Sequence, residues 1–336
     1  MSLYKAESRR LVKRRFTKWL VIGSLVVLAA IAVGVFLTNQ KVGPAQVATA
    51  QAKADREFQQ VTRQAAQEQQ QCQAAQGTSN AGNYPPDCAQ MYTPTREDFD
   101  YHNYMPSTFE FRKTYKVMVT TLAAIFALMA FVIGASFVGA EWSSGGMMNL
   151  LLWRPQRLKV LGTKLAALLV GLAALTTVAL AAWTGFFWLV GRLRGDTSGT
   201  TSGAWQSIAL TEVRALVLVL AAGALGFGLA SLGRHTAMAL GAAIGVVILF
   251  QFGLVTVLSL ANVKFAEAFL VPFWVAAWMD KSVTLENYNS CDFSATQGCL
   301  PETLTITWPT AGGVLAAVIV LVVGAAMWTM RSRDIT

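Results

Sequence analysis

The sequence carries little charge, and almost none where it is most hydrophobic. Only 13% of its 336 residues are Asp, Glu, Lys or Arg, whereas 54% are hydrophobic. Soluble domains carry roughly 25% charged residues, so the composition indicates a bilayer. The long apolar runs contain no Asp, Glu, Lys, Arg or His. Carriers driven by protons or ions retain such groups within their membrane segments, so a pump with its own proton relay is not expected.

Familiar catalytic motifs are also missing. The chain has no GxxxxGK[ST] loop for the phosphates of ATP, no HExxH and no GxSxG. His102 and His235 stand alone. The net charge of +9 comes without zinc-finger spacing, and we expect it to set orientation and contact anionic lipid heads. The sequence therefore predicts no enzyme, no bound cofactor or metal, and no nucleic-acid partner.

Six segments approach or exceed the ~20 apolar residues that a helix needs to cross a bilayer. These predicted spans are residues 19–37, 117–140, 165–190, 215–232, 237–261 and 310–330. The first resembles a signal peptide, but its apolar run exceeds the roughly 7–15 residues usual there, so an uncleaved anchor is predicted. Six crossings place both termini, 1–18 and 331–336, in the cytoplasm, where Lys and Arg collect.

Residues 1–18 predict a basic amphipathic helix lying in the membrane interface, because Val12 and Phe16 share one face. Its cations include Arg9, Arg10 and Arg14. The alternative is a positively charged flank that only holds the N-terminus inside. Both interpretations can hold together.

Residues 38–116 and 262–309 are the two predicted outer loops, and the first is expected to form a small, mostly helical domain with an arm at 45–76. The cysteines Cys72, Cys88, Cys291 and Cys299 all fall in these loops, as expected for disulfides in an oxidising compartment. Local pairing, 72 with 88 and 291 with 299, is the simplest of three connectivities. Metal binding is the alternative. Residues 265–279 are short for a span and predict a re-entrant segment.

The polar side chains within the spans are uncharged. Gln251 and Thr256 in the fifth span either bond across helices or line a substrate path. Glycines in the fourth and fifth spans predict close approach of neighbouring helices; they are Gly223, Gly226, Gly228, Gly241 and Gly245.

The cytoplasmic stretch 141–164 holds the densest set of polar, glycine and basic residues between two apolar runs. It contains Glu141, Ser144, Gly145, Gly146, Met147, Leu151, Arg154, Pro155, Arg157 and Lys164. One interpretation is a basic loop that sets topology. The other is a docking site through which a second protein moves the membrane helices, with an apolar patch at 147–153.

This order of features resembles the membrane-spanning permease subunits of ABC-2 type ABC transporters. An acidic residue ends the second span, and a glycine turn, an apolar patch, a proline beside a basic residue and a lysine follow it. Gly146 departs from the resemblance, because a hydroxyl residue is common there. The resemblance implies an all-α fold with an elbow helix and six transmembrane helices, like a type V exporter. It also implies that residues 147–153 form a coupling helix.

The resemblance implies an exporter of drugs, peptides or lipids in a bacterial cell membrane. Two ABC ATPase subunits would bind ATP and Mg, and a second permease copy, identical or not, would complete the assembly. One alternative is a membrane-anchored assembly or sensing protein that acts through its outer domain. A secondary transporter is a further alternative, which the uncharged spans disfavour.

Overall fold

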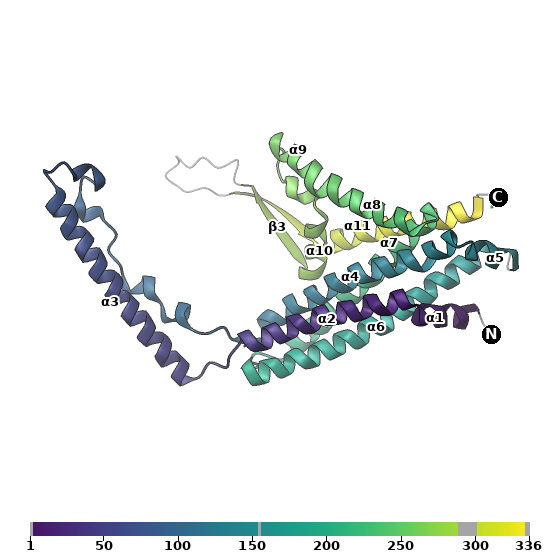
Figure 1. The fold of residues 1–336 in the computed structure, drawn as a ribbon, viewed down its shortest axis with the longest axis horizontal. Helices are drawn as coiled ribbons and strands as arrows, with labels where there is room; N and C mark the ends of the chain where they lie inside the picture. Colours follow the sequence, from purple (N-terminus) through teal and green to yellow (C-terminus); the bar gives the residue numbers. More distant parts are fainter. Residues whose placement is uncertain (1–2, 154–155, 288–300, 333–336) are drawn as a thin grey trace. The chain divides into compact units, whose positions relative to one another are not determined.

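The computed structural model describes residues 3–153, 156–287 and 301–332, most of them in helices (Figure 1). The α-helices are α1 (Leu3–Lys13), α2 (Arg15–Thr38), α3 (Pro44–Ala75), α4 (Phe111–Ser143), α5 (Gly146–Trp153), α6 (Arg157–Arg194), α7 (Ser202–Gly233), α8 (Thr236–Val246), α9 (Val255–Leu260), α10 (Val271–Asp280) and α11 (Trp308–Ser332). The chain forms two compact units. The first comprises Met1–Ile31, Arg112–Phe186 and Thr200–Thr336, and the second Ala32–Phe111 and Phe187–Gly199.

Among the described residues, six helical segments are long and apolar enough to cross a membrane, as predicted. They are α2, α4, α6, α7, the run Thr236–Leu260 and α11. Several extend beyond the apolar runs inside them, because polar residues at their ends continue the backbone hydrogen bonds of the helix. The fold is therefore the predicted polytopic helical membrane protein.

The start of α7 differs most from the prediction, which placed the fourth span at 215–232. The helix begins at Ser202, where Thr201 caps it by accepting a hydrogen bond from the Ala204 amide at 3.3 Å. Glu212 and Arg214 consequently lie within α7. The predicted span 215–232 remains uncharged, but the helix that contains it begins earlier, at Ser202, and carries both charges in its first part. Charged side chains end an apolar run, but they do not end a helix.

The fifth span combines α8 and α9 with an intervening π-helical stretch, η5 (Val247–Leu254). The predicted range 237–261 agrees with this run, but the π turns were not predicted. A π turn inserts an extra residue into the helical ladder, which a hydrophobic run does not reveal.

Glycines bring α4 and α7 together in the first unit. A Cβ atom at Gly226 would lie 2.1 Å from the Phe131 carbonyl oxygen, and one at Gly134 would lie 2.2 Å from the Gly223 carbonyl oxygen. The predicted close approach is confirmed here. In α8, by contrast, a Cβ atom at Gly241 or Gly245 would meet nothing within 4 Å. These two glycines of the fifth span therefore form no close helix contact with the described part of the chain.

The segment between α9 and α11 contains a 3₁₀ turn, η6 (Ala266–Phe269), followed by α10 and an antiparallel hairpin of β3 (Ser282–Asn287) and β4 (Glu302–Thr307). Leu285 and Ile306 from the hairpin join Ala277 of α10 and Ala311 of α11 in a small core. With 10 residues, α10 is too short to cross a bilayer. Its position at the membrane stays a prediction, and Cys291 and Cys299 lie outside the described residues.

The second unit is built on α3, which forms the predicted arm. Cys72 near its end is disulfide-bonded to Cys88, with the Cα atoms 5.9 Å apart. This confirms the local pairing and contradicts metal binding for these two residues, since bonded sulfurs are not thiolate ligands. The chain then returns along α3 through the 3₁₀ turns η1 (Ala81–Asn83), η2 (Cys88–Gln90), η3 (Arg96–Phe99) and η4 (Tyr101–Tyr104).

The second unit also includes residues 187–199, which the predicted outer domain, 38–116, does not contain. A parallel pair of β1 (Phe109–Glu110) and β2 (Gly195–Asp196) ties in residues 187–199, and the rings of Phe109 and Phe187 stack at 5.3 Å. Residues 112–116 instead belong to α4 and the first unit. These boundaries depend on pairing between distant segments, which the local pattern does not show.

We predict that Gly226→Ala destabilises the protein by about 1–3 kcal/mol, because the added methyl group forces the backbones of α4 and α7 apart. Thermal unfolding in detergent measures the effect. The control is Gly241→Ala, which has open space around it and gains the better helix propensity of alanine. Equal melting temperatures for the two variants would contradict the close contact.

We also predict that the double variant Cys72→Ser/Cys88→Ser loosens the end of the arm. The disulfide closes a sequence separation of 16 residues, and a loop of that size corresponds to about 3 kcal/mol. Faster hydrogen exchange in residues 72–90 is expected, with exchange in α4 and α7 unchanged. Unaltered exchange at 72–90 would show that packing along α3 alone holds the return segment.

Candidate functional site

The stretch singled out in the sequence forms the end of α4, a tight turn, the short helix α5 and the start of α6. Gly145 has φ +73°, a left-handed conformation that only glycine adopts without strain. Open space surrounds the position of its missing Cβ, so backbone conformation and not crowding requires this glycine. The Asn149 amide donates to the Gly145 carbonyl at 3.2 Å and starts α5 directly after the turn.

Helix α5 has one face packed on its own chain and one face exposed. Met147 and Leu151, one helical turn apart, are 0% and 7% exposed. Leu152 and Trp153 are 81% and 85% exposed. Among the predicted coupling residues, Met147 and Leu151 therefore anchor the helix, and their neighbours supply the accessible apolar surface. Nearly every residue of this helix is apolar, so no periodic pattern distinguished the two faces beforehand.

In α6, the helix that follows α5, Lys164 is completely buried between two carboxylates. Its Nζ atom lies 2.7 Å from Glu7 Oε2 of α1 and 2.6 Å from Glu141 Oε2 of α4. Arg10 adds a weaker contact to each, with Nη1 3.4 Å from Glu7 Oε1 and 3.9 Å from Glu141 Oε1. We call these four residues the ion network.

The ion network has two cations and two anions, so its charges balance. The Glu7 side chain is 1% exposed and the Lys164 side chain 0%. Buried charges persist only when they are paired and hydrogen-bonded, because removal from water is costly for each. The Lys164 ammonium also lies 5.4 Å from the centre of the Phe137 ring. The network thereby ties the N-terminal helix to both helices that flank α5.

Sequence reasoning identified three members of the ion network and missed Glu7. A signal was present, since Glu7 is the sole acidic residue among residues 1–18. A single carboxylate among seven Lys and Arg residues is a candidate for pairing within the protein, because anionic lipid head groups would repel it.

The remaining predicted residues lie in several elements near the two ends of this stretch or in the N-terminal segment. Ser144 Oγ donates to the Glu141 carbonyl at 3.4 Å, and Arg14 Nη1 donates to the Ser136 carbonyl at 3.0 Å. Arg9 is exposed and Arg157 half-buried. Gly146 opens α5, and Arg154 and Pro155 lie outside the described residues.

The proposed substrate-path residues lie in the second half of the fifth span, Gln251 in the π-helical stretch η5 and Thr256 in α9. Thr256 is exposed, and its hydroxyl donates to the Phe252 carbonyl of its own helix. Gln251 Nε2 is buried and has no hydrogen-bond partner among the described residues. The two side chains are thus not joined to one another. Neither one is linked to a described polar network.

A second polar cluster, which sequence reasoning missed, joins α4, α6 and α7. Glu212 Oε1 accepts hydrogen bonds from Tyr115 Oη at 3.0 Å and from Thr184 Oγ1. Close by, Trp183 Nε1 donates to the Met118 carbonyl at 3.0 Å. These bonds satisfy the Glu212 carboxylate and connect three helices at one level.

We predict that Lys164→Met destabilises the protein by about 3–5 kcal/mol, since it leaves the buried Glu7 carboxylate and the neighbouring Glu141 carboxylate without the lysine that both contact. Thermal unfolding in detergent measures the loss. Lys159→Met, at an exposed position of the same helix, is the control and should have little effect. Adding Glu7→Gln to Lys164→Met should recover part of the loss, and a double variant no more stable than the single one would contradict the pairing.

Comparison with known proteins agrees with the architecture. The family model described as ABC-2 family transporter protein matches residues 1–331. No curated protein matches the chain. The match spans the N-terminal helix, all six candidate membrane helices and α5, so it covers the ion network as well as the fold. The chain belongs to the ABC-2 family of transporter proteins, as a multi-pass membrane component.

Proposed function

We propose that this chain is the permease subunit of an ATP-driven transporter that exports a drug, peptide or lipid-like substrate by alternating access. The observation that carries the proposal is the exposed apolar end of α5, Leu152 and Trp153, on a helix anchored by buried Met147 and Leu151. An apolar helix face with charged neighbours fits a groove on a partner protein. Here that partner is a separate ATPase subunit.

Force applied to α5 would pass to the membrane helices through the residues behind it. The Gly145 turn connects α5 to α4, and Glu141 and Lys164 join α4 to α6 by a short ion pair. Glu141 and Lys164 therefore act as positioning residues within the chain. Packed helices have discrete arrangements, so a small displacement of α5 can select between inward- and outward-facing states.

The assembly would contain two ATPases, which bind ATP and Mg, and a second permease, identical or not, around a two-fold or pseudo-two-fold axis. The run Thr236–Leu260 supports a partner within the membrane, because 0% of its apolar window is buried against the described chain. Its glycines, Gly241 and Gly245, leave space for close helix approach.

The proposed orientation puts both termini in the cytoplasm of a bacterial cell. The positive charge of α1 supports this side for the N-terminus. The disulfide of the second unit supports an oxidising compartment on the other side.

The second candidate is a sensing or assembly role of the outer domain, because the second unit forms a separate compact unit that contains a disulfide. Transport that continues after replacement of residues 45–104 by a short Gly-Ser linker would favour the permease. Loss of a signalling output with transport intact would favour the second role.

We predict that Leu152→Ala/Trp153→Ala weakens ATPase binding about tenfold or more, since exposed aromatic anchors dominate many interfaces. The measurement is the Kd between the permease and its ATPase, followed by substrate-stimulated ATP hydrolysis. Leu260→Ala is a matched control, because Leu260 is 79% exposed against 81% for Leu152. Unchanged binding in the α5 variant would remove α5 as the docking element.

A further inference from the structure

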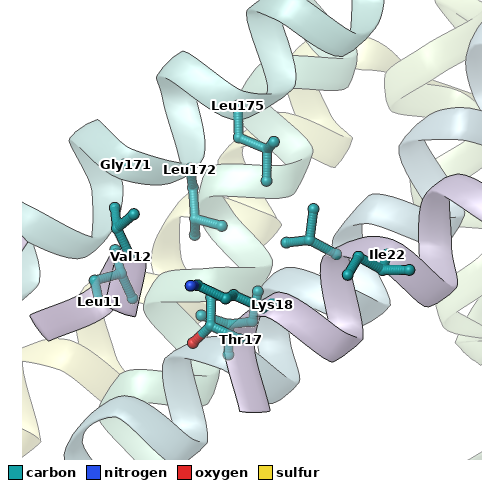
Figure 2. A pocket seen from close by; sticks show the side chains of 10 residues that line it. Leu11, Val12, Thr17, Lys18, Ile22, Gly171, Leu172 and Leu175 are labelled. Carbon is teal, nitrogen blue, oxygen red and sulfur yellow. The ribbon is translucent and has the colours of Figure 1, made fainter. Parts of the chain in front are cut away.

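An apolar pocket of about 340 Å³ lies where the N-terminal helices meet α4 and α6. Figure 2 shows the space between Leu11, Lys18 and Ile22 on one side and Leu172 and Leu175 on the other. Ile133 of α4 also lines the pocket and is 2% exposed. Such a volume is in the range of small-molecule sites, roughly 300–1,000 Å³.

The pocket results from the break between α1 and α2. The helix is interrupted at Arg14, whose guanidinium donates to the Ser136 carbonyl and lies 5.8 Å from the Phe137 ring. On the α1 side, Leu11 packs so tightly on α6 that a Cβ atom at Gly171 would lie 2.8 Å from its Cδ2 atom. The Arg14 contact with α4 and the Leu11 contact with α6 fix the bend between α1 and α2, and the apolar pocket lies beside it.

Lys18 gives this apolar pocket its one ionised lining side chain. Three other cations of this region have internal partners, since Arg10 and Lys164 bind the carboxylates and Arg14 binds a carbonyl. None of the ion pairs formed by the described residues includes Lys18. Lys13 and Arg15 are exposed on the same bend and add positive charge. The pocket is therefore apolar inside and basic at its edge.

We propose that this pocket binds one acyl chain of an anionic phospholipid, with the lipid phosphate against the Lys18 ammonium. An acyl chain suits the aliphatic walls, and a phosphate suits a lysine that can reach the interface. Basic pockets between membrane helices on the cytoplasmic side favour anionic head groups. The proposal requires that the chain lies in a membrane, but not that it transports.

A lipid held here would touch α1, α2, α4 and α6 at once. It would add a second connection between the N-terminal helices and the helices that flank α5, beside the ion network. Anionic lipid would then stabilise the arrangement from which α5 projects, and a neutral lipid with the same chains would do so less.

The test compares dioleoyl phosphatidylglycerol with dioleoyl phosphatidylcholine, which have the same chains, on the purified full chain in a neutral detergent. Native mass spectrometry gives the Kd of each bound lipid. The expected result is about fivefold tighter binding of the anionic lipid, as for one added cation at a charged lipid surface. Equal Kd values for the two lipids would overturn the proposal.

Three variants locate the effect. Lys18→Gln should abolish the preference for the anionic lipid, and the control Lys159→Gln should retain it. Leu175→Trp, which fills the pocket, should weaken the binding of both lipids. Lys18 is exposed, so its substitution tests the proposal even if Leu175→Trp fails to fold. A preserved preference in Lys18→Gln, or competition by glycerol phosphate without acyl chains at the same concentration, would contradict an acyl-chain site.

Discussion

The burial of Lys164 between Glu7 and Glu141 is the constraint on which the end of the membrane unit that carries α1 and α5 depends. Each of these charges alone would be costly away from water. Together, at 2.7 and 2.6 Å, they require α1, α4 and α6 to meet at one place. The N-terminal helix is therefore held by internal charge pairing as well as by any attraction to the membrane surface.

The geometry around α5 follows from this junction. Because α4 and α6 are joined behind it, the short helix needs only a left-handed glycine and two buried side chains to project its remaining apolar residues outward. The same junction holds α1 against α6, and the Arg14 contact then bends the chain into α2. The apolar pocket and the exposed end of α5 are thus two consequences of one anchored bend.

Elsewhere in the first unit, close packing and polar bonds act at different points on the same helices. Glycines allow α4 and α7 to touch along their backbones. Glu212 is bound by Tyr115 and Thr184, so it links α7 to α4 and α6. In a membrane, where association of helices gains little from the hydrophobic effect, such small-residue contacts and hydrogen bonds carry the specificity of packing.

The sequence by itself located the six apolar helices of the described chain, the basic N-terminal segment and the stretch 141–164, and it favoured local pairing of Cys72 with Cys88, because length, hydropathy, charge and cysteine spacing are local properties. It did not determine that Glu7 pairs with Lys164, that Glu212 lies within α7, or that residues 187–199 join the outer unit. It also left undecided which face of α5 is exposed. Those features depend on contacts between segments far apart in the chain, and only the tertiary structure decides which distant charges, glycines and strands meet.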